Sequence, residues 1–413
     1  MTRSTHARRP RRADRRRPAL ASAVGLVLLT TGCAGEAASG STPAAGPATP
    51  HGYVAGAAEL TEPQLQLGYL DASGAAHALD LLTGETTDLG AVGPAGSVAS
   101  DGRFLFVSSE PAGQLTVVDT GSWTVDHGDH THYYRAEPRV VGTLDWAGEV
   151  RVGSSERVTA LFSPTTGGGV VLDREALGRG DLEQTATVGA EPHDGVLLPL
   201  GDGLVGTDGD RVRVLDAAGE PAGGEGAACP GVRGGAATRV GVVVSCADGA
   251  VLATEADGAV TFESIPYPTA VADGDRAAVF AQRPGRPGLA APAGDRGVWL
   301  LDTRAAEWQL VETPTPLLRA VAVDDDRDRV VALDATGRVV VIEPDVGVVA
   351  TTDVLVGSAE DLATATVEVD ADRAYVNVAS AGVVHEIDYV DGARVARSLE
   401  TVVAPAFLAE TGR

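Results

Sequence analysis

The chain has 413 residues, of which 52 are Gly and 23 are Pro, and a formal net charge of -25. So acidic a surface repels nucleic acid and anionic lipid headgroups, and therefore argues against a nucleic-acid partner. Gly and Pro separate short apolar runs throughout, and no stretch shows sustained helical periodicity. This pattern is typical of an all-β chain with many turns.

Residues 1–32 are predicted to be a signal peptide of the lipoprotein type. An arginine-rich segment, 1–17, precedes an apolar run, 18–29, that is too short to span a bilayer comfortably and has the length of a signal-peptide core. The small residue Gly32 before Cys33 resembles a bacterial lipoprotein cleavage site, with Cys33 as the lipidated residue. We therefore expect an exported protein, held by its lipid alone on the outer face of the cytoplasmic membrane. An uncleaved membrane anchor is the alternative.

The rest of the chain is expected to be a tether followed by one folded domain. Residues 33–50 are mainly Gly, Ala, Ser, Thr and Pro, as in flexible linkers, and the folded domain should span 51–413. With Cys33 lipidated, Cys229 and Cys246 remain, and an oxidising compartment makes a structural disulfide between them the default. A metal site there would need further soft ligands close in sequence, and none is present.

One pattern recurs through the folded part: an apolar run that ends in an acidic residue and is followed by a turn. The closing acidic residues are Asp80, Asp119, Asp173, Asp216, Glu263, Asp302, Glu343 and Asp388. A second apolar run usually precedes, after a polar turn such as Asp101-Gly102-Arg103, Asp275-Arg276, Asp328-Arg329 or Asp372-Arg373. Two strands and a hairpin in roughly 40–45 residues are typical of β-propeller blades. We predict a propeller of eight four-stranded blades, with seven as the alternative.

The step from Asp119 to Asp173 is longer than its neighbours, and the additional residues include a histidine cluster. His127, His130 and His132 lie there, three of the eight histidines of the chain. Additional residues between propeller strands form loops on one of the two faces. We therefore expect the cluster to lie on a surface loop rather than in a blade core.

The residue types in this stretch favour a metal site. Imidazole suits zinc, copper and nickel, and tetrahedral zinc accepts His nitrogens at about 2.0–2.1 Å, often beside a carboxylate. Asp126 and Asp129 flank the histidines and are candidates either to bind the ion or to orient a ring. The alternative is a solvated His/Asp loop with only incidental affinity for metals.

No enzymatic motif stands out. Ser122 and Ser154 lie in no G-x-S-x-G sequence, and Asp324-Asp325-Asp326 is interpreted as solvated charge in a hairpin turn. A metal-dependent hydrolase or lyase is one alternative function, because zinc with an open position activates water. A protein-interaction scaffold without a metal is the other.

The stretch 121–134, in which the histidines precede Tyr133-Tyr134, resembles the histidine motif of the AztD family of zinc metallochaperones. Further similarity follows in order along the chain, at His51-Gly52-Tyr53-Val54, Pro192-His193-Asp194-Gly195-Val196, Cys229-Pro230-Gly231, Cys246-Ala247-Asp248-Gly249 and 407–413. The resemblance implies a secreted propeller, not an enzyme, that binds Zn2+ and passes it to the solute-binding protein of a zinc ABC importer.

The resemblance also implies a ligand set. It assigns His127, His130 and His132 to zinc, and His193, which taken alone is an ordinary turn histidine, as a further ligand. Two places depart from the family pattern: Asp194 stands where a second His is expected, and Val232-Arg233 stands where a His is expected. Asp194 remains able to bind a metal and Arg233 does not, so we expect fewer or weaker zinc sites.

Overall fold

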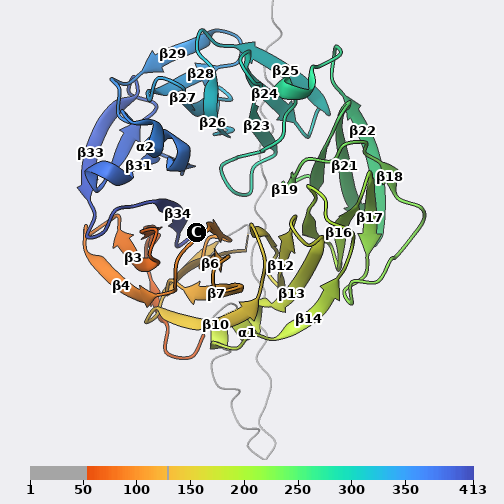
Figure 1. Cartoon of the computed structure of the whole chain (residues 1–413), viewed down its shortest axis with the longest axis horizontal. Coiled ribbons are helices and arrows are strands. Elements are labelled where there is room, and N and C mark those ends of the chain that lie inside the picture. Colours follow the sequence, from red (N-terminus) through yellow and green to blue (C-terminus); the bar gives the residue numbers. More distant parts are fainter. Residues whose placement is uncertain (1–53, 128–129) are drawn as a thin grey trace, which may run out of the picture. The chain divides into compact units, whose positions relative to one another are not determined.

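The apolar runs form antiparallel strands, because Val, Ile and aromatic side chains fit a pleated surface. The computed structural model describes residues 54–127 and 130–413 (Figure 1). Within the unit Thr49–Arg413, eight sheets follow one another in a ring, and the innermost strands of successive sheets are neighbours for most of the circuit. The predicted signal peptide, the lipidation at Cys33, the tether and His51 lie outside the described residues.

Each of the eight sheets is called a blade here, numbered from the one that contains β2, with strands given from the innermost outward. The first blade contains β34 (Phe407–Thr411), β2 (Gln66–Leu70), β3 (Ala75–Asp80) and β4 (Thr86–Ala91). The second contains β5 (Ser97–Ser100), β6 (Phe104–Ser109), β7 (Gln114–Asp119) and β10 (Arg139–Asp145). The third contains β11 (Arg151–Ser154), β12 (Val158–Ser163), β13 (Gly168–Asp173) and β14 (Gln184–Val188). The fourth contains β15 (Leu197–Leu200), β16 (Gly203–Asp208), β17 (Arg211–Leu215) and β18 (Ala227–Ala228).

The remaining four blades continue in chain order. The fifth contains β19 (Gly235–Ala237), β20 (Val242–Cys246), β21 (Gly249–Ala256) and β22 (Ala259–Pro266). The sixth contains β23 (Gly288–Pro292), β24 (Gly297–Asp302) and β25 (Glu307–Glu312). The seventh contains β26 (Leu317–Ala322), β27 (Val330–Asp334), β28 (Val339–Glu343) and β29 (Gly347–Thr351). The eighth contains β30 (Val367–Val369), β31 (Ala374–Val378), β32 (Val383–Asp388) and β33 (Arg394–Glu400).

The predicted propeller with eight blades is confirmed, with one exception to the four-stranded pattern. In the sixth blade the innermost position is occupied only by Ala281 and Gln282, which make isolated bridges to Ala290 and Ala322. In the first blade the innermost strand is β34, which pairs with β2 from Gln66↔Thr411 to Leu70↔Phe407. Pairing between strands from the two ends of the domain therefore closes the ring.

Helices are short and lie in connections. They are α1 (Arg174–Arg179), α2 (Ala359–Thr364) and the 3-10 turns η1 (Asp273–Asp275) and η2 (Ala379–Ala381). Among the residues that the structure describes, no helix has the length and apolar character needed to cross a membrane.

The recurrent acidic residues have a structural role at the ends of strands. Seven of the eight stand at the end of the strand before the outermost one, or one residue beyond it. In all of these but Glu343, whose carboxylate pairs with Arg327 and Arg329, the carboxylate accepts hydrogen bonds from the backbone of the following turn. Asp80, for example, accepts from the N–H groups of Leu82 and Thr83, both at 2.9 Å. Glu263 is the exception, because it lies within β22, the outermost strand of the fifth blade.

The Asp–Arg turns supply a second contact in three blades. The Arg that opens the second strand pairs with the acidic residue that closes the third: Arg103 with Asp119, Arg329 with Glu343 and Arg373 with Asp388. The two strands are antiparallel neighbours, so the start of one meets the end of the other. Arg276 differs, because it follows η1 and pairs with Asp273 instead.

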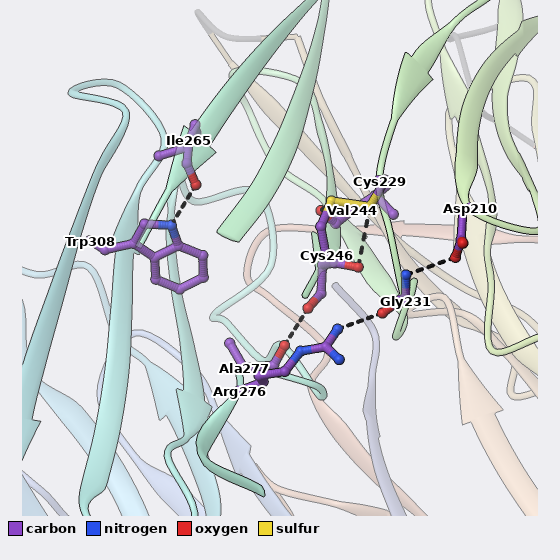
Figure 2. Close-up of a disulfide and its surroundings, with 10 residues drawn as sticks. Asp210, Cys229, Gly231, Val244, Cys246, Ile265, Arg276, Ala277 and Trp308 are labelled. Carbon is purple, nitrogen blue, oxygen red and sulfur yellow. Dashed lines mark hydrogen bonds between the residues drawn. A yellow bond between two sulfur atoms is a disulfide. The ribbon is translucent and has the colours of Figure 1, made fainter. Parts of the chain in front are cut away.

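The predicted disulfide between Cys229 and Cys246 is present, with both residues buried (Figure 2). It joins the connection that follows β18 to the end of β20, and so links the fourth blade to the fifth. Around it, Gly231 N–H donates to Asp210 Oδ1 at 2.7 Å and Arg276 donates to the Gly231 carbonyl. The disulfide therefore belongs to a bonded junction between blades.

The ring-closing strand β34 carries a buried carboxyl group, Glu410. Its Oε2 accepts a hydrogen bond from Arg413 Nη1 at 2.8 Å, while its Oε1 has no hydrogen-bond partner among the described residues. Burial raises the pKa of Glu410 to about 7; Arg413 opposes the rise, and Asp370 and Glu368 add to it.

Replacing both cysteines with Ser should destabilise the fold without abolishing it. The bridge closes a 17-residue separation, and loops of that size are worth about 3 kcal/mol through restriction of the unfolded chain. Urea unfolding followed by tryptophan fluorescence should show a lower midpoint for C229S/C246S than for the oxidised protein. An unchanged midpoint would contradict a stabilising role, and the reduced wild type serves as the control.

Glu410 should make stability fall as pH rises. Its pKa in the folded protein, about 7, is above the ordinary value of 4.5, so between these limits the folded state holds a proton that the unfolded state has released. The melting temperature should therefore decrease from pH 5 to pH 8, and E410Q should reduce that decrease. E400Q, at an exposed position of β33, is the matched control, and equal pH profiles for E410Q and wild type would refute this assignment.

Candidate metal centre

The predicted insertion is a β-hairpin between β7 and β10 of the second blade. Its strands are β8 (Ser122–Asp126) and β9 (Thr131–Arg135), so the connection is more ordered than the surface loop expected from the sequence. The chain enters the hairpin at Gly121, where φ is 77° and a Cβ atom would lie 2.3 Å from the Ala136 carbonyl oxygen. Ala136 N–H donates to the Gly121 carbonyl at 2.7 Å. A glycine is therefore required where the hairpin closes.

A third strand from a distant part of the sequence completes this small sheet. Strand β1 (Ala58–Leu60) pairs with β9 through Ala58↔Arg135, Glu59↔Tyr134 and Leu60↔Tyr133. The hairpin and β1 together are called the metal hairpin sheet below. Because β1 precedes β2 in the chain, this sheet connects the start of the described residues to the second blade.

The three clustered histidines converge at the tip of the metal hairpin sheet. One ligand atom from each of His127, His130 and His132 lies within 4.8 Å of the others. The turn brings His127 and His130 together, since His127 N–H donates to the His130 carbonyl at 2.9 Å, and the ring centroids of these two are 4.9 Å apart. Small side-chain rotations would place all three nitrogens at about 2.0–2.1 Å from one ion.

The three histidines differ in exposure. His127 and His130 are exposed in the turn, whereas His132 is half-buried on β9. Within 54–127 and 130–413, no other group of three His, Cys, Asp or Glu residues has a geometry that could hold a metal ion. The cluster is thus a site with one fixed and two accessible imidazoles.

Glu59 is a residue of this site that the sequence did not reveal. Its Oε1 lies 2.6 Å from His132 Nδ1, which leaves Nε2 as the remaining ring nitrogen of His132. The two residues are 73 positions apart, and β1 has only three residues with no alternating pattern. Nothing in the sequence therefore indicated that β1 would lie against the histidines.

A stack of rings and a buried ion pair connect His132 to the second blade. The His132 ring stacks on Tyr134 at 6.1 Å, Tyr134 on Trp123 at 5.4 Å, and the Arg103 guanidinium lies 3.6 Å above the Trp123 ring. Burial, together with the nearby charge of Glu59, raises the pKa of the Tyr134 phenol. Arg103 in turn binds Asp119 through two hydrogen bonds, of 3.0 and 2.7 Å. His132 is therefore fixed to the blade core.

Further contacts attach the metal hairpin sheet to the closure of the ring. Ser122 Oγ donates to the Gln64 carbonyl and Thr124 Oγ1 to the Gly412 carbonyl, both at 2.7 Å. Arg135 pairs with Asp80 at the end of β3. Burial opposes ionisation of Asp80, but the Thr83 N–H group and Arg135 outweigh it and lower its pKa.

The structure does not bring His193 to the three clustered histidines. The β7–β10 connection precedes the outermost strand of a blade and the connection with His193 follows one, so they lie at opposite ends of the antiparallel strands. His193 Nδ1 lies 2.8 Å from the Glu191 carbonyl and Nε2 lies 2.7 Å from Thr207 Oγ1. Both ring nitrogens are thus engaged, one within the connection before β15 and the other with Thr207 on β16.

The predicted acidic candidates have different positions. Asp126 is exposed at the end of β8, opposite Thr131, and is not part of the convergent group. Asp129 lies outside the described residues. Asp194 forms an ion pair with Arg151, and Arg233 forms one with Asp273 at 2.9 Å. The two positions that depart from the family pattern are therefore occupied by ion pairs.

Comparison with known proteins agrees with these observations. No protein-family model matches the chain. A curated relative, the zinc chaperone AztD of Citrobacter koseri, is 24% identical over 235 residues, which is 54% of this chain and 55%, about half, of the relative. That relative is named as a chaperone and not as an enzyme.

Solved structures support the fold over a longer stretch. The crystal structure of Citrobacter koseri AztD matches with a TM-score of 0.72 and 20% identity, covering 85% of this chain and 98% of that one; its apo form gives 0.72 and 19%, with the same coverage. The dihydro-heme d1 dehydrogenase NirN gives a TM-score of 0.55 at 16% identity, covering 86% and 76%. The resemblance of this chain to the AztD family of zinc chaperones is thereby confirmed.

Proposed function

We propose that this chain is an extracytoplasmic zinc-binding metallochaperone whose metal centre is the cluster of His127, His130 and His132. The observation that carries this proposal is the convergence of three imidazoles within 4.8 Å. The name of the curated relative, a zinc chaperone, supports zinc as the metal. Imidazole alone does not distinguish zinc from copper or nickel.

Three imidazole ligands suit transfer better than permanent storage. Structural zinc sites are closed by four protein ligands, whereas a site with three leaves one position for water or for an incoming ligand. His127 and His130 are exposed, so a ligand from another protein can approach the ion and replace them one at a time. His132, fixed on β9, would hold the ion until the exchange is complete.

We propose the solute-binding protein of a zinc ABC importer as the acceptor. Such an acceptor works outside the cytoplasmic membrane, where the proposed signal peptide and lipid at Cys33 would place this chain. We propose no nucleic-acid partner, and contact with the membrane through the lipid alone. The disulfide fits an oxidising compartment of this kind.

Removing the three histidines should remove one zinc site. We expect H127A/H130A/H132A to bind one equivalent of zinc less than wild type in calorimetric titration of the metal-free protein. H193A is the informative control, since both nitrogens of His193 are engaged in another part of the propeller. An unchanged stoichiometry in the triple variant, or a loss of the site in H193A, would overturn the assignment.

Zinc should pass directly to the acceptor. If the fourth position admits a ligand from the partner, transfer from the loaded protein to a metal-free solute-binding protein should be faster than loss of zinc to a bulky chelator that cannot dock. Stopped-flow measurement with a fluorescent zinc reporter can compare the two rates. Equal rates, with no dependence on acceptor concentration, would mean that zinc only dissociates into solution and would refute direct transfer.

A further inference from the structure

Glu59 and His132 make a close contact between a carboxylate and one of the clustered histidines. Glu59 Oε1 lies 2.6 Å from His132 Nδ1, and the side chains are 46% and 22% exposed respectively. At this distance the two atoms share a proton, and because a carboxylate accepts hydrogen bonds, Nδ1 is the donor. The other nitrogen, Nε2, then carries the lone pair that a metal needs.

Strand pairing places Glu59 where its carboxylate can accept a hydrogen bond from His132 Nδ1. Glu59 is the middle residue of β1 and pairs with Tyr134, two residues after His132 on β9. Residues two apart on a strand share a face, so His132 and Tyr134 lie on the same side of the sheet. Downstream, the Gln64 carbonyl accepts from Ser122 Oγ at 2.7 Å, which limits how far β1 can move along the hairpin.

His132 receives its support from regular strands. His127 and His130 belong to the turn, whereas His132 has Glu59 beside it and the Tyr134–Trp123 stack beneath it. Carboxylates that accept from the second nitrogen of a metal-binding histidine fix the ring, set its tautomer and make it more basic. One residue from β1 can thus fix the orientation and the tautomer of a metal-binding ring.

We propose that Glu59 is a positioning residue of the metal centre, through which strand β1 holds His132 with Nδ1–H toward the carboxylate and Nε2 toward the ion. This inference rests on the proposed zinc function of the three histidines. It makes β1, which is remote in sequence, a required part of the site.

The test compares E59A with E62A. Both variants remove one carboxylate from the short segment before β2, and both positions are exposed. Glu59 contacts His132, whereas Glu62 has no side-chain contact with a histidine among the described residues. Zinc affinity, measured by competition with a chelator of known affinity, should be about 10–100-fold weaker in E59A, with the stoichiometry unchanged, and should be unaffected in E62A. Equal affinity in the two variants would overturn the proposal. A far greater loss would make Glu59 a zinc ligand, and would overturn the positioning role as well.

A second readout needs no metal. In the metal-free protein at pH 8, 15N–1H correlation of the His132 ring should show the proton on Nδ1 in wild type and E62A, and a shift toward the Nε2–H tautomer in E59A. A proton on Nε2 in wild type would refute the proposal. If the three-histidine variant retains all its zinc while wild-type His132 is protonated on Nδ1, the proposed zinc function fails and the orientation by Glu59 stands.

Discussion

The metal hairpin sheet depends on one buried ion pair, Arg103–Asp119. The same pairing, between the start of a second strand and the end of a third, recurs in the seventh and eighth blades. In the second blade the Arg103 guanidinium also covers Trp123, the second residue of the hairpin. Breaking such a buried pair from one side costs roughly 3–5 kcal/mol, because the other charge is left uncompensated. A contact that recurs in the repeat therefore also supports the proposed metal centre.

The site is also tied to the closure of the ring. Gln64 and Gly412, which flank the paired strands β2 and β34, both accept hydrogen bonds from β8. The three-residue strand β1 then extends from this junction along the hairpin. Consequently the part of the molecule proposed to exchange ligands rests on the place where both ends of the domain meet. A transfer site needs ligands that are held by a rigid scaffold and are exposed to an incoming partner, and this arrangement offers both.

Much of the fold was predictable because the repeat has local causes. The acidic residues that cap turns, such as Asp80, and the Arg–acid pairs are encoded within one blade, so their spacing revealed both the blade count and the insertion that carries the histidines. The site was only partly predictable. Glu59 lies 73 positions from His132 in the chain and is brought beside it by strand pairing, which no local pattern encodes. His193 was assigned by resemblance, and strand direction places it at the other end of the blades. Glu263 misled because the third strand of the fifth blade ends at Ala256 and is followed directly by Asp257, so the equivalent acidic residue stands earlier in the chain than Glu263.

The location of the bound ion tests the central claim most directly. Crystals of zinc-loaded protein, with anomalous data collected on either side of the zinc absorption edge, would show where the metal is bound. We predict a peak at the tip of the metal hairpin sheet, about 2.0–2.1 Å from one nitrogen each of His127, His130 and His132. The Glu59 carboxylate should remain on His132 Nδ1, and the fourth position should hold no ligand from the same chain. A zinc ion bound elsewhere, with these three imidazoles unoccupied, would contradict the account.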